Sequence, residues 1–128
     1  MIQAYNVNMS YKEDIQVLND VSFKVQKGEF VFLVGESGAG KTTILRLLYR
    51  GLIPTSGELV VAGRNLSTLS KSEIPDFRRQ IGVVFQDFKL LPNKTVQQNI
   101  AISMKVTGIK STEVHHNVNQ LLQQMSLV

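Results

Sequence analysis

The sequence predicts an α/β fold, and three observations support this prediction. Residues 2–9 and 17–25 alternate apolar and polar side chains with a period of two, which is typical of half-buried β-strands. Residues 30–34 (FVFLV) are continuously apolar and β-rich, which predicts a buried strand. A glycine-rich segment at residues 35–42 follows directly and leads into residues 44–49, which favour a helix and contain no glycine or proline.

The glycine-rich segment at residues 35–42 matches the phosphate-binding pattern G-x-x-x-x-G-K-[ST]. In this pattern, glycines let backbone N–H groups point at phosphate oxygens, and the following helix directs its positive dipole end to the same place. We predict that Lys41 bridges the β- and γ-phosphates of a nucleotide and that the Thr42 hydroxyl ligates Mg²⁺. An ordinary strand-to-helix turn is the alternative, but the pattern arises by chance in well under ~1% of chains of this length. The predicted nucleotide-binding residues of this loop are Gly35, Glu36, Ser37, Gly38, Ala39, Gly40, Lys41 and Thr42.

The segments after the first helix predict a hairpin, a short helix and a further strand. Residues 58–61 are expected to form a strand that turns tightly, at an alanine and a glycine, into residues 64–66. Residues 70–80 are polar and partly helical. Residues 81–85 (IGVVF) predict another buried strand.

The last third of the sequence predicts two helices. Thr95 is expected to be the N-cap of a helix over residues 96–104. Ser111 or Thr112 is expected to cap a second helix. The apolar residues of that second helix recur at helical spacing, which predicts one buried face; they are Val114, Val118, Leu121, Leu122 and Met125.

Composition limits the function classes. The 128 residues are 43% hydrophobic and 19% charged, include no cysteine, and carry a formal net charge of +4. The composition is globular, and the absence of cysteine excludes disulfides and thiolate chemistry. The sequence shows no secretory signal and no apolar run of membrane-spanning length, so we expect a cytoplasmic protein. Basic residues are scattered, with Arg78 and Arg79 as the only adjacent pair, so no nucleic-acid partner is expected.

Two further features relate the chain to a known family. Residues 81–92 read IGVVFQDFKLLP, and an aromatic residue, Tyr11, lies upstream of the loop. Together with the loop, these features resemble the ATP-binding subunits of ABC systems, and the resemblance extends over essentially all of residues 1–128. Within the family, DFRRQIGVVFQDFKLLPNKTV at residues 76–96 and VTG at residues 106–108 are most similar to the members that act in bacterial cell division.

The resemblance implies roles for five residues. It implies that Tyr11 stacks on the adenine, that Val17 lies near the base or ribose, and that Thr43 reaches the α-phosphate. Gln86 matches the family's Q-loop glutamine, which positions the attacking water; with Thr42, it would also ligate Mg²⁺. Without the resemblance, Tyr11 is explained as a half-buried aromatic side chain and Gln86 as a polar strand end.

The resemblance also implies a P-loop NTPase fold of the ABC-ATPase type. Residues 1–86 would contain the antiparallel β subdomain and the P-loop part of a partial core sheet, and residues 87–128 the Q-loop and the start of the helical subdomain. After Gln86, the sequence contains no LSGGQ-like signature and no strand that ends in Asp-Glu. His115 and His116 are expected to face solvent rather than act as a switch histidine. We therefore expect the N-terminal part of an ATPase subunit, with the C-terminal half absent, which binds ATP without hydrolysing it alone.

For the full-length subunit, the resemblance implies a homodimer that sandwiches ATP and an integral membrane partner resembling FtsX. The subunit would be peripheral on the inner face of the cell membrane and would convert ATP binding and hydrolysis into conformational change of the partner. Two alternatives stay open: the ATPase of a lipoprotein or small-molecule ABC transporter, and a non-catalytic nucleotide-binding module. A GTPase is disfavoured because residues 93–96 read NKTV rather than Asn-Lys-x-Asp, and a nucleotide kinase because no basic lid is evident.

Overall fold

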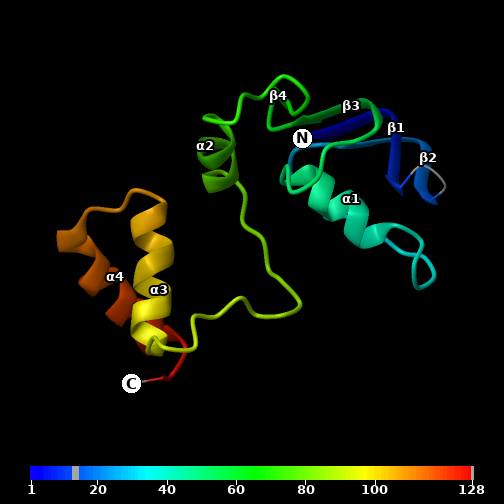
Figure 1. The fold of residues 1–128 in the computed structure, drawn as a ribbon. Coiled ribbons are helices and arrows are strands. Elements are labelled where there is room, and N and C mark those ends of the chain that lie inside the picture. Colours follow the sequence, from blue (N-terminus) through cyan, green and yellow to red (C-terminus); the bar gives the residue numbers. More distant parts are fainter. Residues whose placement is uncertain (13–14, 128) are drawn as a thin grey trace. The chain divides into compact units, whose positions relative to one another are not determined.

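The computed structural model describes residues 1–12 and 15–127, and it contains two compact units, Met1–Ile81 and Gly82–Val128. Figure 1 shows the strands in the first unit and a pair of helices in the second. The two units are described separately below. The combination of sheet and helices confirms the predicted α/β class.

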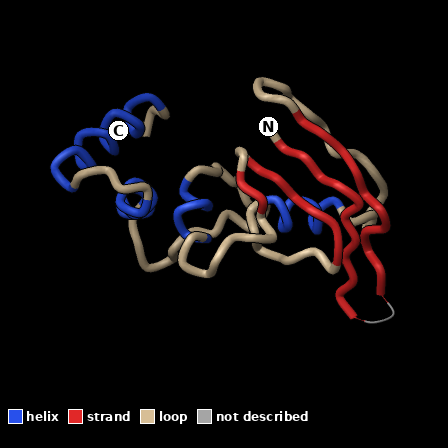
Figure 2. Tube along the Cα trace, turned by 90° about the horizontal axis from the view of Figure 1, so that it is seen from above, coloured by secondary structure: helices blue, strands red, loops and turns tan. Residues whose placement is uncertain are grey.

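The first unit is built on an antiparallel sheet with the strand order β2-β1-β3-β4. The long strands β1 (Ile2–Lys12) and β2 (Ile15–Val25) form one hairpin. The strands β3 (Ser56–Val61) and β4 (Arg64–Asn65) form the predicted second hairpin, and β3 pairs with β1. Figure 2 shows these strands side by side.

The ladder between β1 and β3 is regular from Ile2↔Val61 to Tyr5↔Glu58 and then shifts before the next pair, Asn8↔Ser56. Asn6 lies at this shift with a φ of 46°, in the left-handed region. Its N–H donates to Ser22 Oγ on β2 at 2.8 Å. The extra residue on β1 makes this a β-bulge, which bends the strand locally.

Two helices complete the core of the first unit. Helix α1 (Lys41–Leu48) lies along one face of the sheet, and helix α2 (Ile74–Arg79) follows the second hairpin. Leu47 on α1 and Phe77 on α2 are almost fully buried against the sheet, and their burial is what attaches these short helices. The buried core residues are Ala4, Val7, Met9, Leu18, Leu47, Leu59, Val61, Leu66 and Phe77.

The strands predicted at residues 30–34 and 81–85 are wrong. Both segments lie outside the sheet that the described residues form, and most of their side chains are exposed, with Phe30 84% and Val84 100% accessible. A strand needs a partner that completes its backbone hydrogen bonds, and neither segment pairs with β1–β4. Both segments have the apolar composition of a strand, but composition alone does not supply a pairing partner.

The second unit contains helix α3 (Val96–Val106) and helix α4 (Ser111–Gln124). Val114, Val118 and Leu122 of α4 are buried against α3, as the spacing predicts. Leu121 and Met125 are exposed, so the buried face is narrower than expected. The N-cap of α4 is Lys110 and makes no side-chain bond, so the expected capping by Ser111 or Thr112 is wrong.

Thr95 is the N-cap of α3, as predicted. The Gln98 N–H donates to Thr95 Oγ1 at 3.2 Å, and the Thr95 N–H donates to Gln98 Oε1 at 3.1 Å, which forms a capping box.

We expect Thr95→Ala to destabilise the second unit by about 1 kcal/mol, because the Gln98 N–H loses its acceptor. Chemical denaturation followed by helical circular dichroism measures this, with Thr112→Ala as the control. Equal effects of the two substitutions would contradict the capping role.

Glu73 precedes α2 and accepts two hydrogen bonds from Ser70, one from the hydroxyl at 2.6 Å and one from the N–H at 2.9 Å. Both bonds lower the pKa of the Glu73 carboxyl below its ordinary value. The bond from the Ser70 hydroxyl has the larger effect, and the bond from the Ser70 N–H has the smaller one. The bonds therefore stabilise the fold above the unfolded-state pKa of about 4.3, and this contribution is lost as the pH falls through the lower folded-state pKa.

We expect Ser70→Ala to raise the pKa of Glu73 in an NMR titration, whereas Ser67→Ala leaves it unchanged.

Candidate functional site

The glycine-rich loop is held against strand β2 by close backbone packing. Gly38 and Gly40 have φ values of 82° and 87°, in the left-handed region that glycine adopts without strain. A Cβ on Gly40 would lie 2.8 Å from Leu18 Cδ2 and 3.2 Å from the Val17 carbonyl oxygen. Gly40 is therefore required both for its conformation and for the close approach of the loop to β2.

Helix α1 begins directly after the loop and presents a free N-terminus. Its N-cap, Gly40, makes no side-chain hydrogen bond, and its first turn contains no acidic residue. The first N–H groups of a helix have no intrahelical acceptor, and they carry the positive end of the helix dipole. This N-terminus favours an anion, which agrees with the phosphate-binding role predicted for the loop.

The side chain of Lys41 folds back over the loop. Its Nζ donates to the Gly35 carbonyl oxygen at 2.7 Å and to the Glu36 carbonyl oxygen at 2.6 Å. The Ala39 N–H donates to the same Glu36 oxygen at 3.2 Å. The ammonium group is thus held on the loop by two neutral acceptors, and a phosphate oxygen is a stronger acceptor than either of them.

The predicted site residues from β1, β2, the loop and α1 surround one cavity of about 380 Å³. Tyr11, from the end of β1, reaches α1, where its hydroxyl lies 3.0 Å from Thr43 Oγ1. Tyr11 is 47% exposed, whereas Thr43 is only 5% exposed. Gly35, Glu36 and Ala39 belong to the loop but do not line this cavity. Its lining residues are Tyr11, Val17, Ser37, Gly38, Gly40, Lys41, Thr42 and Thr43.

Gln86, the predicted Q-loop residue, belongs to the second unit and starts a turn with Asp87. Next to it, Asp87 forms an ion pair with Lys89, and the hydrogen bond from Lys89 is the main cause that lowers the pKa of Asp87. The nucleotide cavity belongs to the first unit. The contact of Gln86 with Mg²⁺ and water therefore stays a prediction.

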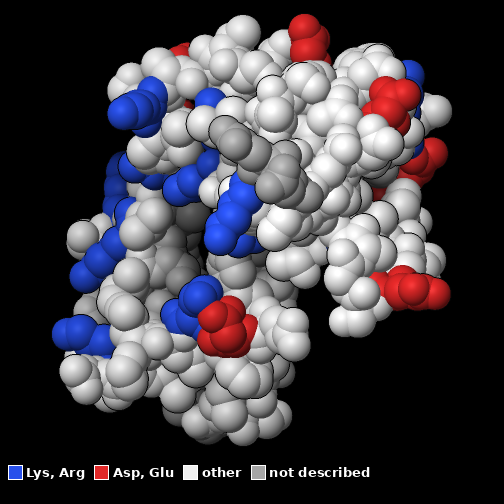
Figure 3. Space-filling view, turned by 45° about the vertical axis from the view of Figure 1, so that its right-hand side comes forward, with Lys and Arg blue, Asp and Glu red and all other residues white. Residues whose placement is uncertain are grey.

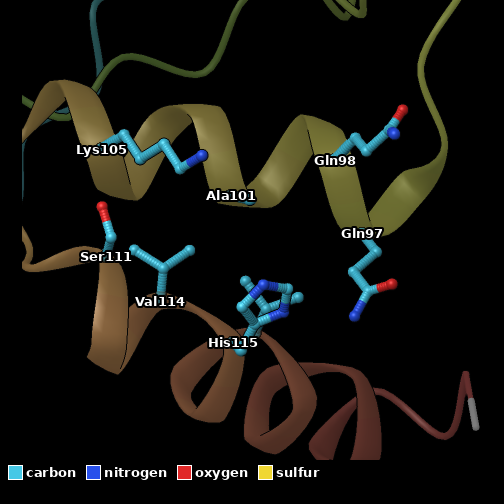
Figure 4. A pocket seen from close by; sticks show the side chains of 8 residues that line it. Gln97, Gln98, Ala101, Lys105, Ser111, Val114 and His115 are labelled. Atoms are coloured by element: carbon cyan, nitrogen blue, oxygen red, sulfur yellow. The ribbon is translucent and has the colours of Figure 1, made fainter.

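A second cavity, of about 300 Å³, lies between α3 and α4 (Figure 4). His115 lines it and remains exposed, as does His116 beside it. Gln97, across the cavity on α3, donates from Nε2 to Asn119 Oδ1 at 3.3 Å. Among residues 1–12 and 15–127, no group of three or more His, Cys, Asp or Glu side chains could hold a metal ion.

Charged side chains of both signs are present on the face drawn in Figure 3, and the basic ones form several separate groups. Within the described part of the chain, none of the helices has the length and apolar character needed to cross a bilayer.

Comparison with known proteins relates nearly the whole chain to one family. Residues 18–128 match the family model described as ABC transporter. The chain is 41% identical over 127 residues to the cell division ATP-binding protein FtsE of Bacillus subtilis (strain 168), covering 99% of this chain and 56% of that protein. It is 44% identical over 127 residues to FtsE of Streptococcus pneumoniae serotype 2 (strain D39 / NCTC 7466), covering 99% and 55%.

A solved structure gives the same result for the fold. It is a dimeric ATP-binding cassette in a post-hydrolysis state, bound to ADP and Pi, and it superimposes with a TM-score of 0.86 at 31% identity. The match covers 96% of this chain and 56% of that one, so the chain spans about half the length of the relatives it matches. The predicted ABC-ATPase fold is confirmed, and the chain belongs to the ABC transporter family.

Proposed function

We propose that the chain is the nucleotide-binding part of an ATP-binding subunit, and that it holds ATP with Mg²⁺ in the cavity beside the glycine-rich loop. The convergence of three elements carries this proposal. The aromatic ring of Tyr11, the loop glycines and the N-terminus of α1 line one cavity of about 380 Å³. An aromatic face accepts a purine, and a glycine-rich loop before a helix N-terminus accepts phosphates.

Five of the residues that line the cavity have individual roles in this proposal. Tyr11 stacks on the adenine, and Val17 lies against the base or ribose. Lys41 leaves its two carbonyl acceptors and binds the β- and γ-phosphates, because charge-assisted bonds to phosphate are the stronger ones. Thr42, which is exposed in the first turn of α1, supplies a hydroxyl oxygen to Mg²⁺, and Thr43 binds the α-phosphate.

We further propose that the chain contains two parts of an ATPase domain. We assign residues 1–86 to the β subdomain and the P-loop part of the core, and residues 87–128 to the Q-loop and the start of the helical subdomain. In this assignment, Gln86 lies at the junction and joins Thr42 as a ligand of Mg²⁺, where it also orients the attacking water. When bound, Mg²⁺ would neutralise phosphate charge during phosphoryl transfer.

The relatives support a role in cell division. Two proteins named FtsE are 41% and 44% identical to this chain over almost its full length. We propose that the full-length subunit dimerises, hydrolyses ATP and moves an integral membrane protein resembling FtsX at the inner face of the cell membrane. Residues 87–104 would face that partner. Co-purification of the subunit with the membrane protein tests this assembly, and its failure would favour the transporter ATPase instead.

Hydrolysis needs more than the residues that line this cavity. They supply one cation, Lys41, and N–H donors for the phosphates, but none of them is a carboxylate or histidine that could act as a general base. We therefore propose that residues 1–128 bind ATP and do not turn it over alone. A phosphate-release assay at saturating ATP measures this directly.

Isothermal titration with MgATP tests the proposed site through Tyr11. We expect Tyr11→Ala to weaken ATP binding by roughly 5- to 150-fold, because stacking of one base on an aromatic side chain contributes about 1–3 kcal/mol. Tyr5→Ala is a matched control, since Tyr5 lies on the same strand and is 49% exposed, close to the 47% of Tyr11. If both variants bound ATP as tightly as the parent chain, the nucleotide would not lie against Tyr11.

A further inference from the structure

The hydrogen bond between Tyr11 and Thr43 connects two elements that are distant in sequence. Tyr11 lies near the end of β1, and Thr43 lies in the first turn of α1. Their hydroxyl oxygens are 3.0 Å apart, and either one could be the donor. The bond therefore joins the aromatic wall of the cavity to the phosphate side of the same cavity.

Thr43 is a buried polar residue, and its hydroxyl is hydrogen-bonded to Tyr11. Thr43 is 5% exposed, and no buried side-chain oxygen or nitrogen of the described residues is left without a hydrogen bond. A threonine in a helix has two available χ1 rotamers, because its hydroxyl can also turn to a carbonyl one turn earlier. The bond to Tyr11 favours the rotamer that brings Thr43 Oγ1 to Tyr11, and both residues line the same cavity.

The direction of this bond matters once a phosphate is present. A phosphate oxygen only accepts, whereas a threonine hydroxyl has one proton and two lone pairs. If Thr43 donates its proton to Tyr11, none remains for the phosphate. If Tyr11 donates to Thr43, the Thr43 proton is free, and a donor that itself accepts a hydrogen bond is polarised toward a stronger bond.

From this geometry we infer that Tyr11 is a positioning residue for the phosphates: its hydroxyl donates to Thr43 Oγ1 and thereby aims the Thr43 proton at the nucleotide's phosphate chain. This inference rests on the proposed nucleotide site and adds a role that the ring of Tyr11 cannot perform. Phenylalanine, histidine and tryptophan could stack on a base, but none of them places a hydroxyl donor 3.0 Å from Thr43. The hydroxyl therefore gives tyrosine an advantage here over other aromatic residues.

Inorganic tripolyphosphate separates the hydroxyl from the ring, because it has phosphates but no base to stack. We expect Tyr11→Phe to weaken binding of both MgATP and tripolyphosphate by a similar factor, about threefold to tenfold, which corresponds to one hydrogen bond. Tyr5→Phe, on the same strand and outside the cavity, should change neither affinity. A loss confined to ATP would show that Tyr11 acts on the base alone and would overturn the inference.

A double-mutant cycle with Thr43 tests whether the effect passes through its hydroxyl. Thr43→Val keeps the side-chain shape and removes the hydroxyl, so Tyr11→Phe should cause no further loss in that background. Thr43→Ser restores the hydroxyl and should restore sensitivity to Tyr11→Phe. Equal effects of Tyr11→Phe with and without the Thr43 hydroxyl would overturn the inference.

The two proposals fail in different ways. If the parent chain binds neither ATP nor tripolyphosphate, the proposed nucleotide site is wrong, and the role of the Tyr11 hydroxyl is wrong with it. If the parent chain binds both ligands and Tyr11→Phe binds them equally well, only the positioning role is wrong. Thermal unfolding of each variant, followed by tyrosine fluorescence, confirms that the compared proteins are folded.

Discussion

Lys41→Ala is expected to weaken MgATP binding by roughly 100-fold or more, because the lysine would make two charge-assisted bonds to phosphate, each contributing about 1.5–3 kcal/mol. The same ammonium group donates to the Gly35 and Glu36 carbonyl oxygens. The ammonium group therefore lies on the loop, and it exchanges these two neutral acceptors for phosphate oxygens, which are stronger acceptors. Isothermal titration measures the affinity.

Two companion variants make the Lys41 experiment specific. Lys27→Ala removes the same unit of charge from the turn at residues 27–28, so it reports any general electrostatic effect on an anionic ligand. Lys41→Arg keeps the charge but replaces a compact ammonium group with a planar fork, and we expect an intermediate affinity. ATP binding that is unchanged by Lys41→Ala would refute the assignment of the loop as the phosphate site.

Gly57→Ala is expected to destabilise the first unit by about 2–5 kcal/mol. Gly57 lies on β3 opposite the bulge at Asn6 and has a φ of 87°. A Cβ at this position would lie 2.6 Å from the Asn6 carbonyl carbon and from the Tyr5 carbonyl oxygen, and closer still to the Asn6 carbonyl oxygen. The left-handed conformation costs an alanine about 1–2 kcal/mol, and displacing the backbone of β1 adds about 1–3 kcal/mol.

Gly63→Ala separates these two costs. Gly63 has a similar φ of 79°, but a Cβ there would have no neighbour within 4 Å, so only the conformational cost of about 1–2 kcal/mol applies. Urea denaturation followed by tyrosine fluorescence is suited to the comparison, because the chain has no tryptophan and its three tyrosines all lie in Met1–Ile81. Equal destabilisation by the two substitutions would mean that the bulge tolerates a side chain at Gly57.

Local patterns predicted the elements whose stability is decided locally. The period-two alternation of residues 2–9 and 17–25 corresponds to β1 and β2, because each strand has one face toward the core and one toward solvent. The N-cap of α3 is also decided locally, and Thr95 occupies it as predicted. The glycine-rich loop and α1 are also local, and the sequence motif placed them correctly.

Features that depend on distant pairing were not predictable in the same way. Residues 30–34 have strand composition, but strand formation requires a neighbour, and β1–β4 do not provide one. The bulge at Asn6 and the approach of Gly57 depend on the register between strands about 50 residues apart. The bond between Tyr11 and Thr43 depends on the same folding of β1 beside α1, so the hydroxyl of Tyr11 gave no signal in the sequence.

The exposed run at residues 30–34 has a consequence for the behaviour of the chain in solution. FVFLV is β-rich, uncharged and free of proline, and its five side chains are all exposed. A segment of this kind can add to the same segment of another copy, since its backbone groups are available for intermolecular strand pairing. Self-association of this type increases with protein concentration. We therefore expect the residues that lead into the phosphate loop to promote self-association of the chain as its concentration rises.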